Sequence, residues 1–126
     1  GNGEQEGNKE THARVEEAKE LIRAGYGDSS LSLESVSGKL GLTAPYLSRI
    51  FVEHQPPGFL DYLNRYRLEQ AKLLLIETGE TVGDIGLRVG FNSPQSFIRV
   101  FKRYEGETPG QFRTRMKGEE QREDER

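Results

Sequence analysis

The feature of this sequence that most constrains its fold is an internal repeat. A short apolar pattern occurs twice at an offset of 49: Val36, Leu40, Gly41 and Leu42 in the first copy, and Ile85, Val89, Gly90 and Phe91 in the second. After one inserted residue the copies match again at an offset of 50: Thr43, Leu47, Arg49, Ile50 and Phe51 against Ser93, Phe97, Arg99, Val100 and Phe101. The chain is therefore expected to build the same local structure twice.

Each copy of the repeat predicts two helices joined by a tight turn. Apolar residues spaced three and four apart, such as Phe97, Val100 and Phe101, lie on one face of a helix. The glycine of each copy ends the first helix, because glycine tolerates the left-handed backbone found at helix C-termini. Thr43 and Ser93 are suited to cap the second helix. Two helices with such a turn form a helix-turn-helix unit, so two of these units are predicted.

The same signals along the whole chain predict an all-α protein of seven helices. The longest covers residues 59–77, where a broad apolar sector indicates contact with neighbours on more than one side. The other six are expected over 13–25, after Ser32, after Thr43, after Thr81, after Ser93 and over a short stretch after Thr108. Asp84, three residues after Thr81, is expected to complete a capping box.

The length and the charge distribution of the chain indicate how it is organised into parts. Its 126 residues suit one compact domain or two very small ones. The expected parts are a flexible acidic linker (1–11), a first helix-turn-helix subdomain (12–58), the linker helix (59–77), a second subdomain (78–116) and a charged tail (117–126). The net charge of −3 lies in the two ends, since each end carries −2 and residues 12–116 carry +1. A body so nearly neutral can bind nucleic acid only if its basic groups lie on one face.

Composition excludes several functional classes. The chain has no cysteine, and therefore no disulfide framework or thiolate metal site. Phosphate-binding glycine loops, paired metal ligands and nucleophile elbows are absent from the sequence, so neither an enzyme nor a cofactor is expected. His12 and His54 are far apart in sequence and are interpreted as surface residues. No apolar run is long enough for a membrane span, and no signal peptide opens the chain.

The outward residues of the second helix of each unit are the candidate functional residues. In a helix-turn-helix unit this helix enters the DNA major groove, and its N-terminal part meets the base edges. Arginine pairs with guanine and glutamine with adenine, while proline can contact a thymine methyl group. One exposed arginine is more often a solvated surface charge. Arg49 and Arg99 occupy the same position of both copies, which favours a functional role.

The second copy resembles the DNA-binding domain of the AraC/XylS family of bacterial transcription regulators. The resemblance rests on "VGDIGLRVGFNSPQSFIRVFKRYEGETPGQFR", residues 82–113, and extends over about residues 12–116. It implies seven helices, with two helix-turn-helix subdomains joined by a long linker helix. It also implies DNA base contacts at Pro45, Ser48, Arg49, Pro94, Gln95, Ser96 and Arg99. The candidate phosphate contacts are Lys39, Lys102, Arg103 and Arg113.

Some positions depart from the family pattern. The family favours alanine at the close helix–helix contact of each unit, where this chain has Ser37 and Gly86. Both residues are small, so the packing is expected to survive. Gly86 costs up to about 1 kcal/mol of helix propensity relative to alanine. Val52 stands where a basic residue is common, which leaves one cation on the first reading helix.

The function expected from these features is sequence-specific binding of double-stranded DNA in two successive major-groove segments. The chain would be the output domain of a cytoplasmic AraC-type transcription regulator. The resemblance implies a missing N-terminal sensor or receiver domain, through which any dimerisation would occur, and RNA polymerase as a partner. The alternative is a protein-interaction module on the same scaffold that contacts RNA polymerase or a regulatory domain.

Overall fold

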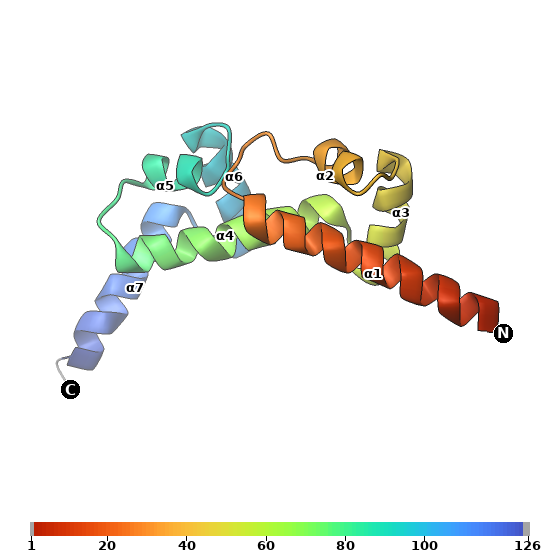
Figure 1. Ribbon diagram of the computed structural model, residues 1–126. Helices are drawn as coiled ribbons and strands as arrows, with labels where there is room; N and C mark the ends of the chain where they lie inside the picture. The colour runs from red at the N-terminus through yellow and green to blue at the C-terminus, as the bar shows by residue number, and fades with distance from the viewer. Residues whose placement is uncertain (1, 125–126) are drawn as a thin grey trace. The chain divides into compact units, whose positions relative to one another are not determined.

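The protein is all-α, as predicted, in a computed structural model that describes residues 2–124 (Figure 1). Seven helices form this described part of the chain, and it contains no strand. They are α1 (Asn2–Gly25), α2 (Leu33–Lys39), α3 (Ala44–His54), α4 (Phe59–Glu77), α5 (Val82–Arg88), α6 (Pro94–Glu105) and α7 (Pro109–Asp124). The predicted number of helices is therefore confirmed.

The first and last helices are longer than the sequence pattern indicated. Helix α1 begins at Asn2 instead of near residue 13, and α7 continues to Asp124 instead of ending near residue 116. Apolar periodicity detects only the turns that pack against a neighbour. The added part of α7 is a charged run with an exposed ion pair between Arg115 and Glu119 at 3.4 Å, and lysine, glutamate, glutamine and arginine all favour helix.

The chain divides into two compact units, Gly1–Asn64 and Arg65–Arg126. The boundary falls within α4, so the first unit contains α1 to α3 with the start of α4. The second unit contains the rest of α4 with α5 to α7. Each unit therefore holds one copy of the sequence repeat and part of the long helix.

The core of the first unit joins α1 to both helices of the repeat. Its fully buried side chains include Val15, Ala18 and Ile22 of α1, Val36 of α2, and Leu47, Ile50 and Phe51 of α3. The ring of Phe51 also packs edge-on against Phe59 and Tyr62 of α4, with centroid distances of 5.5 and 5.7 Å. These contacts orient α3 by its apolar face and leave the opposite face to solvent.

The core of the second unit is a line of aromatic rings. Phe91 packs on Phe97 at 5.4 Å, Phe97 on Phe101 at 5.8 Å, and Phe101 on Phe112 of α7 at 5.6 Å between centroids. Buried aliphatic residues surround this line: Leu68, Ala71 and Leu75 of α4, Ile85 of α5 and Val89 after it. Because Phe97 and Phe101 anchor α6, the face of that helix carrying polar and basic residues points outward.

Candidate nucleic-acid interface

Helix α6 is held firmly at both ends. Ser93 caps its start, with its side chain accepting a hydrogen bond from the Ser96 amide at 3.1 Å, and Pro94 occupies the first turn. The Ser96 hydroxyl completes a capping box by accepting from the Ser93 amide at 3.3 Å. Gly106 ends the helix in the left-handed conformation, with φ of 79°. The predicted caps are confirmed here.

The outer face of α6 is basic and free of carboxylates from its own helix. Gln95, Arg99, Lys102 and Arg103 are all exposed. Within residues 2–124, Arg99 has no ion-pair partner, so its guanidinium is available to an external acceptor. Ser96 is different, because its hydroxyl also donates to the Ser93 carbonyl at 2.9 Å and is largely used by the cap.

Helix α3 presents the equivalent face of the first unit with a weaker charge. Thr43 caps it, and Pro45 and Arg49 are exposed while Ser48 is half-buried. The Arg49 guanidinium lies 5.2 Å from the centroid of the Tyr46 ring, and its Nη1 lies 3.9 Å from a Glu53 carboxylate oxygen. A neighbouring carboxylate therefore offsets part of the positive charge of Arg49.

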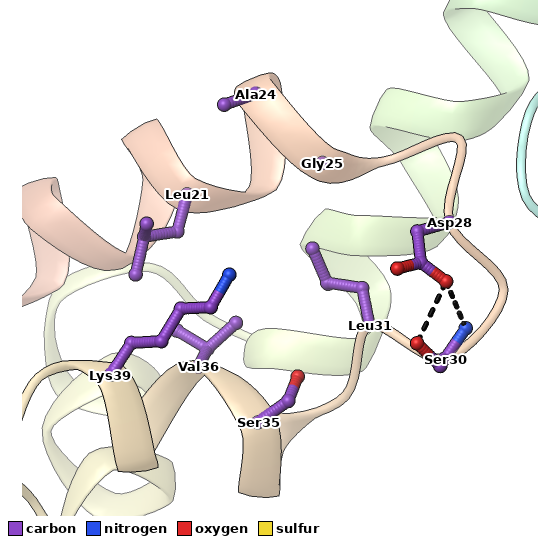
Figure 2. A pocket seen from close by; sticks show the side chains of 9 residues that line it. All are labelled: Leu21, Ala24, Gly25, Asp28, Ser30, Leu31, Ser35, Val36 and Lys39. Carbon is purple, nitrogen blue, oxygen red and sulfur yellow. Dashed lines mark hydrogen bonds between the residues drawn. The ribbon is translucent and has the colours of Figure 1, made fainter.

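Lys39 lines a groove of about 400 Å³ between the end of α1 and α2 (Figure 2). Leu21, Leu31 and Val36 provide apolar walls to this groove. Asp28 at its edge accepts hydrogen bonds from the Ser30 amide and hydroxyl at 2.8 and 2.7 Å. Lys39 is exposed, and its phosphate contact stays a prediction.

Arg113 has an intramolecular role that the sequence did not show. Its Nε donates to the Leu75 carbonyl at 2.9 Å, and one Nη donates to the Thr78 carbonyl at 3.3 Å. These carbonyls lie at the C-terminal end of α4, where backbone acceptors lack helical partners. Arg113 therefore ties α7 to the end of α4, and its phosphate contact stays a prediction.

Lys72 links the C-terminal end of α6 to α4. Its ammonium lies 2.6 Å from a Glu105 carboxylate oxygen and 3.1 Å from one of Glu69. Partial burial lowers the pKa of Lys72, but the hydrogen bonds to these carboxylates outweigh burial and raise the pKa. No sequence pattern indicated this pair, because 33 residues separate Lys72 from Glu105.

The structure adds detail to the interpretation of the two histidines and of the helix caps, and it shows one buried arginine. His12 and His54 are partners, with ring centroids 5.5 Å apart, and Thr11 is hydrogen-bonded to His54 at 2.8 Å. Arg67, which the sequence places on α4, is buried with its guanidinium 5.8 Å from the Phe91 centroid. A capping box forms at Ser32 and at Ser93, whereas Thr81 only accepts from the Asp84 amide.

Residues 2–124 hold no group of three or more histidine, aspartate or glutamate side chains arranged to bind a metal ion. None of the described helices combines the length and the apolar character that a membrane crossing requires.

The comparison with protein families decides the assignment of this fold. A family model described as a helix-turn-helix domain matches residues 36–115, which include both copies of the repeat and the whole of α4. The chain belongs to the AraC-type helix-turn-helix family. This AraC-type domain therefore serves sequence-specific DNA binding in transcription regulation, and its family and fold are those of transcription regulators.

Individual relatives agree with this assignment. The AraC-type domain is 45% identical over 83 residues to an uncharacterized HTH-type transcriptional regulator of Staphylococcus aureus (strain MSSA476), covering 66% of this chain and 11% of that protein. It is 32% identical over 109 residues to the Msm operon regulatory protein of Streptococcus mutans, covering 86% of this chain and 39% of that protein. The chain thus spans only a minor part of these relatives.

A solved structure has the same fold. The C-terminal domain of the two-component response regulator yesN from Fusobacterium nucleatum superimposes with a TM-score of 0.74 at 40% identity. The match covers 76% of this chain and 93% of that domain. The predicted arrangement of two helix-turn-helix subdomains with a long linker helix is confirmed by this family fold.

Proposed function

We propose that the AraC-type domain reads DNA mainly through the outer face of α6, with α3 as a second and weaker reading helix. The observation that carries this is the exposed arginine at one register of both units. Arg49 and Arg99 each lie on a capped helix whose opposite face is buried in the core. Such a helix can enter the major groove without disturbing its own unit.

The residues on these faces suit distinct contacts. Arg99 pairs with guanine through its two-pronged guanidinium, and Gln95 pairs with adenine through its amide. Pro94 and Pro45 contact thymine methyl groups, and Ser48, Ser96 and Arg49 complete the base-reading set. Lys102 and Arg103 extend the basic face toward the C-terminal end of α6, where they meet phosphates and set the register on the duplex. Lys39 and Arg113 complete the proposed phosphate set.

We propose that the two reading helices occupy two successive segments of the major groove. When both reading helices insert, their centres lie about 34 Å apart along the duplex, which is one turn of B-DNA. A helix of 19 residues such as α4 is about 28 Å long, so its length is of the right scale to join two such reading units.

We also propose that this domain is one part of a longer regulator. Since the chain spans a small share of its relatives and matches the C-terminal domain of a response regulator, we place a sensor or receiver part on its N-terminal side. That part would detect the signal and provide any dimer contact. RNA polymerase is the proposed partner at the promoter, and the bacterial cytoplasm, where the DNA lies, is the proposed location.

The test is selection of bound duplexes from a random library, followed by arginine variants. Arg99→Ala is expected to weaken binding to the selected duplex by about 1–3 kcal/mol and to relax preference at one base pair. Arg99→Lys keeps the charge but loses the planar fork, so it should restore binding to a scrambled duplex better than to the selected one. Arg122→Ala, an exposed charge in the last turn of α7, is the matched control.

The rival role for Arg99 is contact with phosphate alone. That role predicts equal weakening on selected and scrambled duplexes and a salt dependence shallower by about one. Equal losses would remove Arg99 from the base readers. A folded wild-type domain that enriches no duplex and is not retained on DNA at low salt would refute the proposed reading mode.

A further inference from the structure

Two arginines from different helices of the second unit lie against one tyrosine ring. The guanidinium carbon of Arg65 is 5.0 Å from the centroid of the Tyr104 ring, and that of Arg103 is 5.8 Å from the same centroid. Arg65 belongs to α4, whereas Arg103 and Tyr104 are neighbours in the last turn of α6. Because both distances end at one centroid, the two guanidinium carbons are at most about 11 Å apart. Tyr104 therefore brings a cation of α4 to the C-terminal end of the reading helix.

The ring restrains both cations without neutralising them. Arg65 and Arg103 are exposed, and Tyr104 is half-buried. A guanidinium within about 6 Å of an aromatic centroid is attracted by the negative face of the ring and keeps its full positive charge. At an exposed site such a contact is worth a factor of about 2–5 in an equilibrium constant. The ring thus offsets part of the repulsion between two like charges that lie close together.

Two nearby carboxylates are engaged by a different cation. Glu69 lies one turn after Arg65 on α4, and Glu105 follows Tyr104 on α6. The Lys72 ammonium lies 3.1 Å from a carboxylate oxygen of Glu69 and 2.6 Å from one of Glu105. Lys72 therefore offsets the negative charge of these two carboxylates beside the tyrosine ring.

The arginine pair continues the basic face of α6. Arg103 follows Arg99 by four residues, so the two side chains lie on the same face, one turn apart. At a rise of about 1.5 Å per residue, Arg103 is about 6 Å beyond Arg99 along the helix axis. The major groove is only about 12 Å wide, so the sugar–phosphate backbone lies beside the later turns of a helix whose first turns meet base edges. Arg65 extends this basic border from α6 onto α4.

We infer that Arg65 is a further phosphate-binding residue and that Tyr104 is a positioning residue, which holds Arg65 and Arg103 toward one stretch of the DNA backbone. This inference rests on the proposed reading of DNA by α6. Holding the two guanidiniums before DNA arrives lowers the entropy cost of the contact, because a free arginine side chain has many rotamers to lose. Tyr104 itself acts through the two arginines.

The first test counts phosphate contacts on a scrambled duplex over a series of salt concentrations. Arg65→Gln should make the slope of log affinity against log salt shallower by about one, and Arg65→Lys should restore it. Arg115→Gln is the matched control. The Arg115 guanidinium also lies near an aromatic ring, 5.5 Å from the Phe112 centroid, but it is paired with Glu107 at 2.8 Å and with Glu119 at 3.4 Å. Its loss should leave the slope unchanged.

The second test separates the ring from its bulk. Tyr104→Phe keeps the aromatic face and Tyr104→Leu removes it, while both leave every charged residue in place. Tyr104→Leu should weaken binding to the scrambled duplex by about fivefold, and Tyr104→Phe should stay within about twofold of the wild type. When Arg65 and Arg103 are both replaced by glutamine, Tyr104→Leu should have no further effect on binding. A merely structural role of the ring would give the same loss in both backgrounds.

Circular dichroism establishes that each variant keeps the wild-type helix content. Four results would overturn the inference alone: an unchanged slope for Arg65→Gln, an equal change of slope for Arg115→Gln, equal binding by Tyr104→Leu and Tyr104→Phe, or an Arg65→Gln variant that does not fold. The last would show that Arg65 serves stability. A folded wild-type chain that binds no duplex at low salt would instead overturn the proposed function, and this inference with it.

Discussion

Arg113 is predicted from the sequence to contact a DNA phosphate, whereas in the structure it binds the end of α4. Replacing Arg113 distinguishes these two roles. The guanidinium of Arg113 donates to the Leu75 and Thr78 carbonyls, at 2.9 and 3.3 Å, at the C-terminal end of α4. Arg113→Met removes both donors and keeps most of the apolar stem. Arg113→Lys keeps the positive charge but not the two-pronged geometry.

The expected cost follows from these two bonds. A hydrogen bond from a charged donor contributes about 1.5–3 kcal/mol when it is buried. Arg113 is only half-buried and its second bond is long, so the lower end of that range applies to the pair. A cation near a helix C-terminus adds about 0.3–1 kcal/mol. Arg113→Met should therefore lower the free energy of unfolding by about 2 kcal/mol, and Arg113→Lys by about half of that.

Urea unfolding followed by circular dichroism measures this cost. With a denaturant slope of about 1–2 kcal/mol/M for a unit of this size, Arg113→Met should move the unfolding midpoint of the second unit down by about 1–2 M. Arg122→Met in the last turn of α7 is the control and should leave the midpoint unchanged. The reasoning is wrong if Arg113→Met leaves the midpoint in place while the salt dependence of DNA binding becomes shallower by about one, as loss of a phosphate contact would cause.

Two further predictions concern the reading helices and the α4–α6 ion pair. Saturation mutagenesis of the selected duplex should show one half-site tolerating changes better, because Glu53 offsets Arg49 on α3 while Arg99 on α6 is free of carboxylates from its own helix; equal tolerance in both halves would contradict this. Lys72→Met should lower the free energy of unfolding by about 1 kcal/mol at neutral pH, by loss of its hydrogen bonds to Glu105 and Glu69. Because the folded pKa of Lys72 is raised, its contribution is complete below the unfolded value of about 10.4 and is lost as the pH rises through the folded value. The urea midpoints of wild type and variant should therefore stay apart up to about pH 10.4 and converge only above it; convergence at lower pH would contradict this.

Local signals in the sequence were sufficient for the helices and for the orientation of the reading faces. Caps such as Thr43 and Ser93 act on amides within three residues, so they can be read without knowing the fold. Arg99 lies between Phe97 and Phe101 in the sequence, and once these two face the core, Arg99 must face outward. The same reasoning failed at the ends of α1 and α7, because their outer turns have no apolar face to pack and so produce no periodic signal.

Such local signals could not predict contacts between residues that are far apart in the sequence. Nothing near Arg113 in the sequence identifies Leu75 and Thr78 as its acceptors, and nothing near His12 identifies His54. The same holds for the pairing of Lys72 with Glu105. A charged side chain has many possible partners of similar energy, and only the packing of the helices brings one of them within hydrogen-bond distance.

The sequence by itself determined two helix-turn-helix units and the register of Arg49 and Arg99, because helix periodicity and capping depend on neighbours within four residues. The tertiary structure alone decided that Arg113 is engaged by α4 while Arg99 is left free. The offset of Arg49 by Glu53 is local, because the two residues lie four apart on α3. The tertiary structure also decided how closely α5 and α6 approach, since a Cβ atom added to Gly86 would lie 2.6 Å from Phe97 Cδ2. The distance between two packed helices depends on the side chains of both, and the pattern of one helix does not contain it.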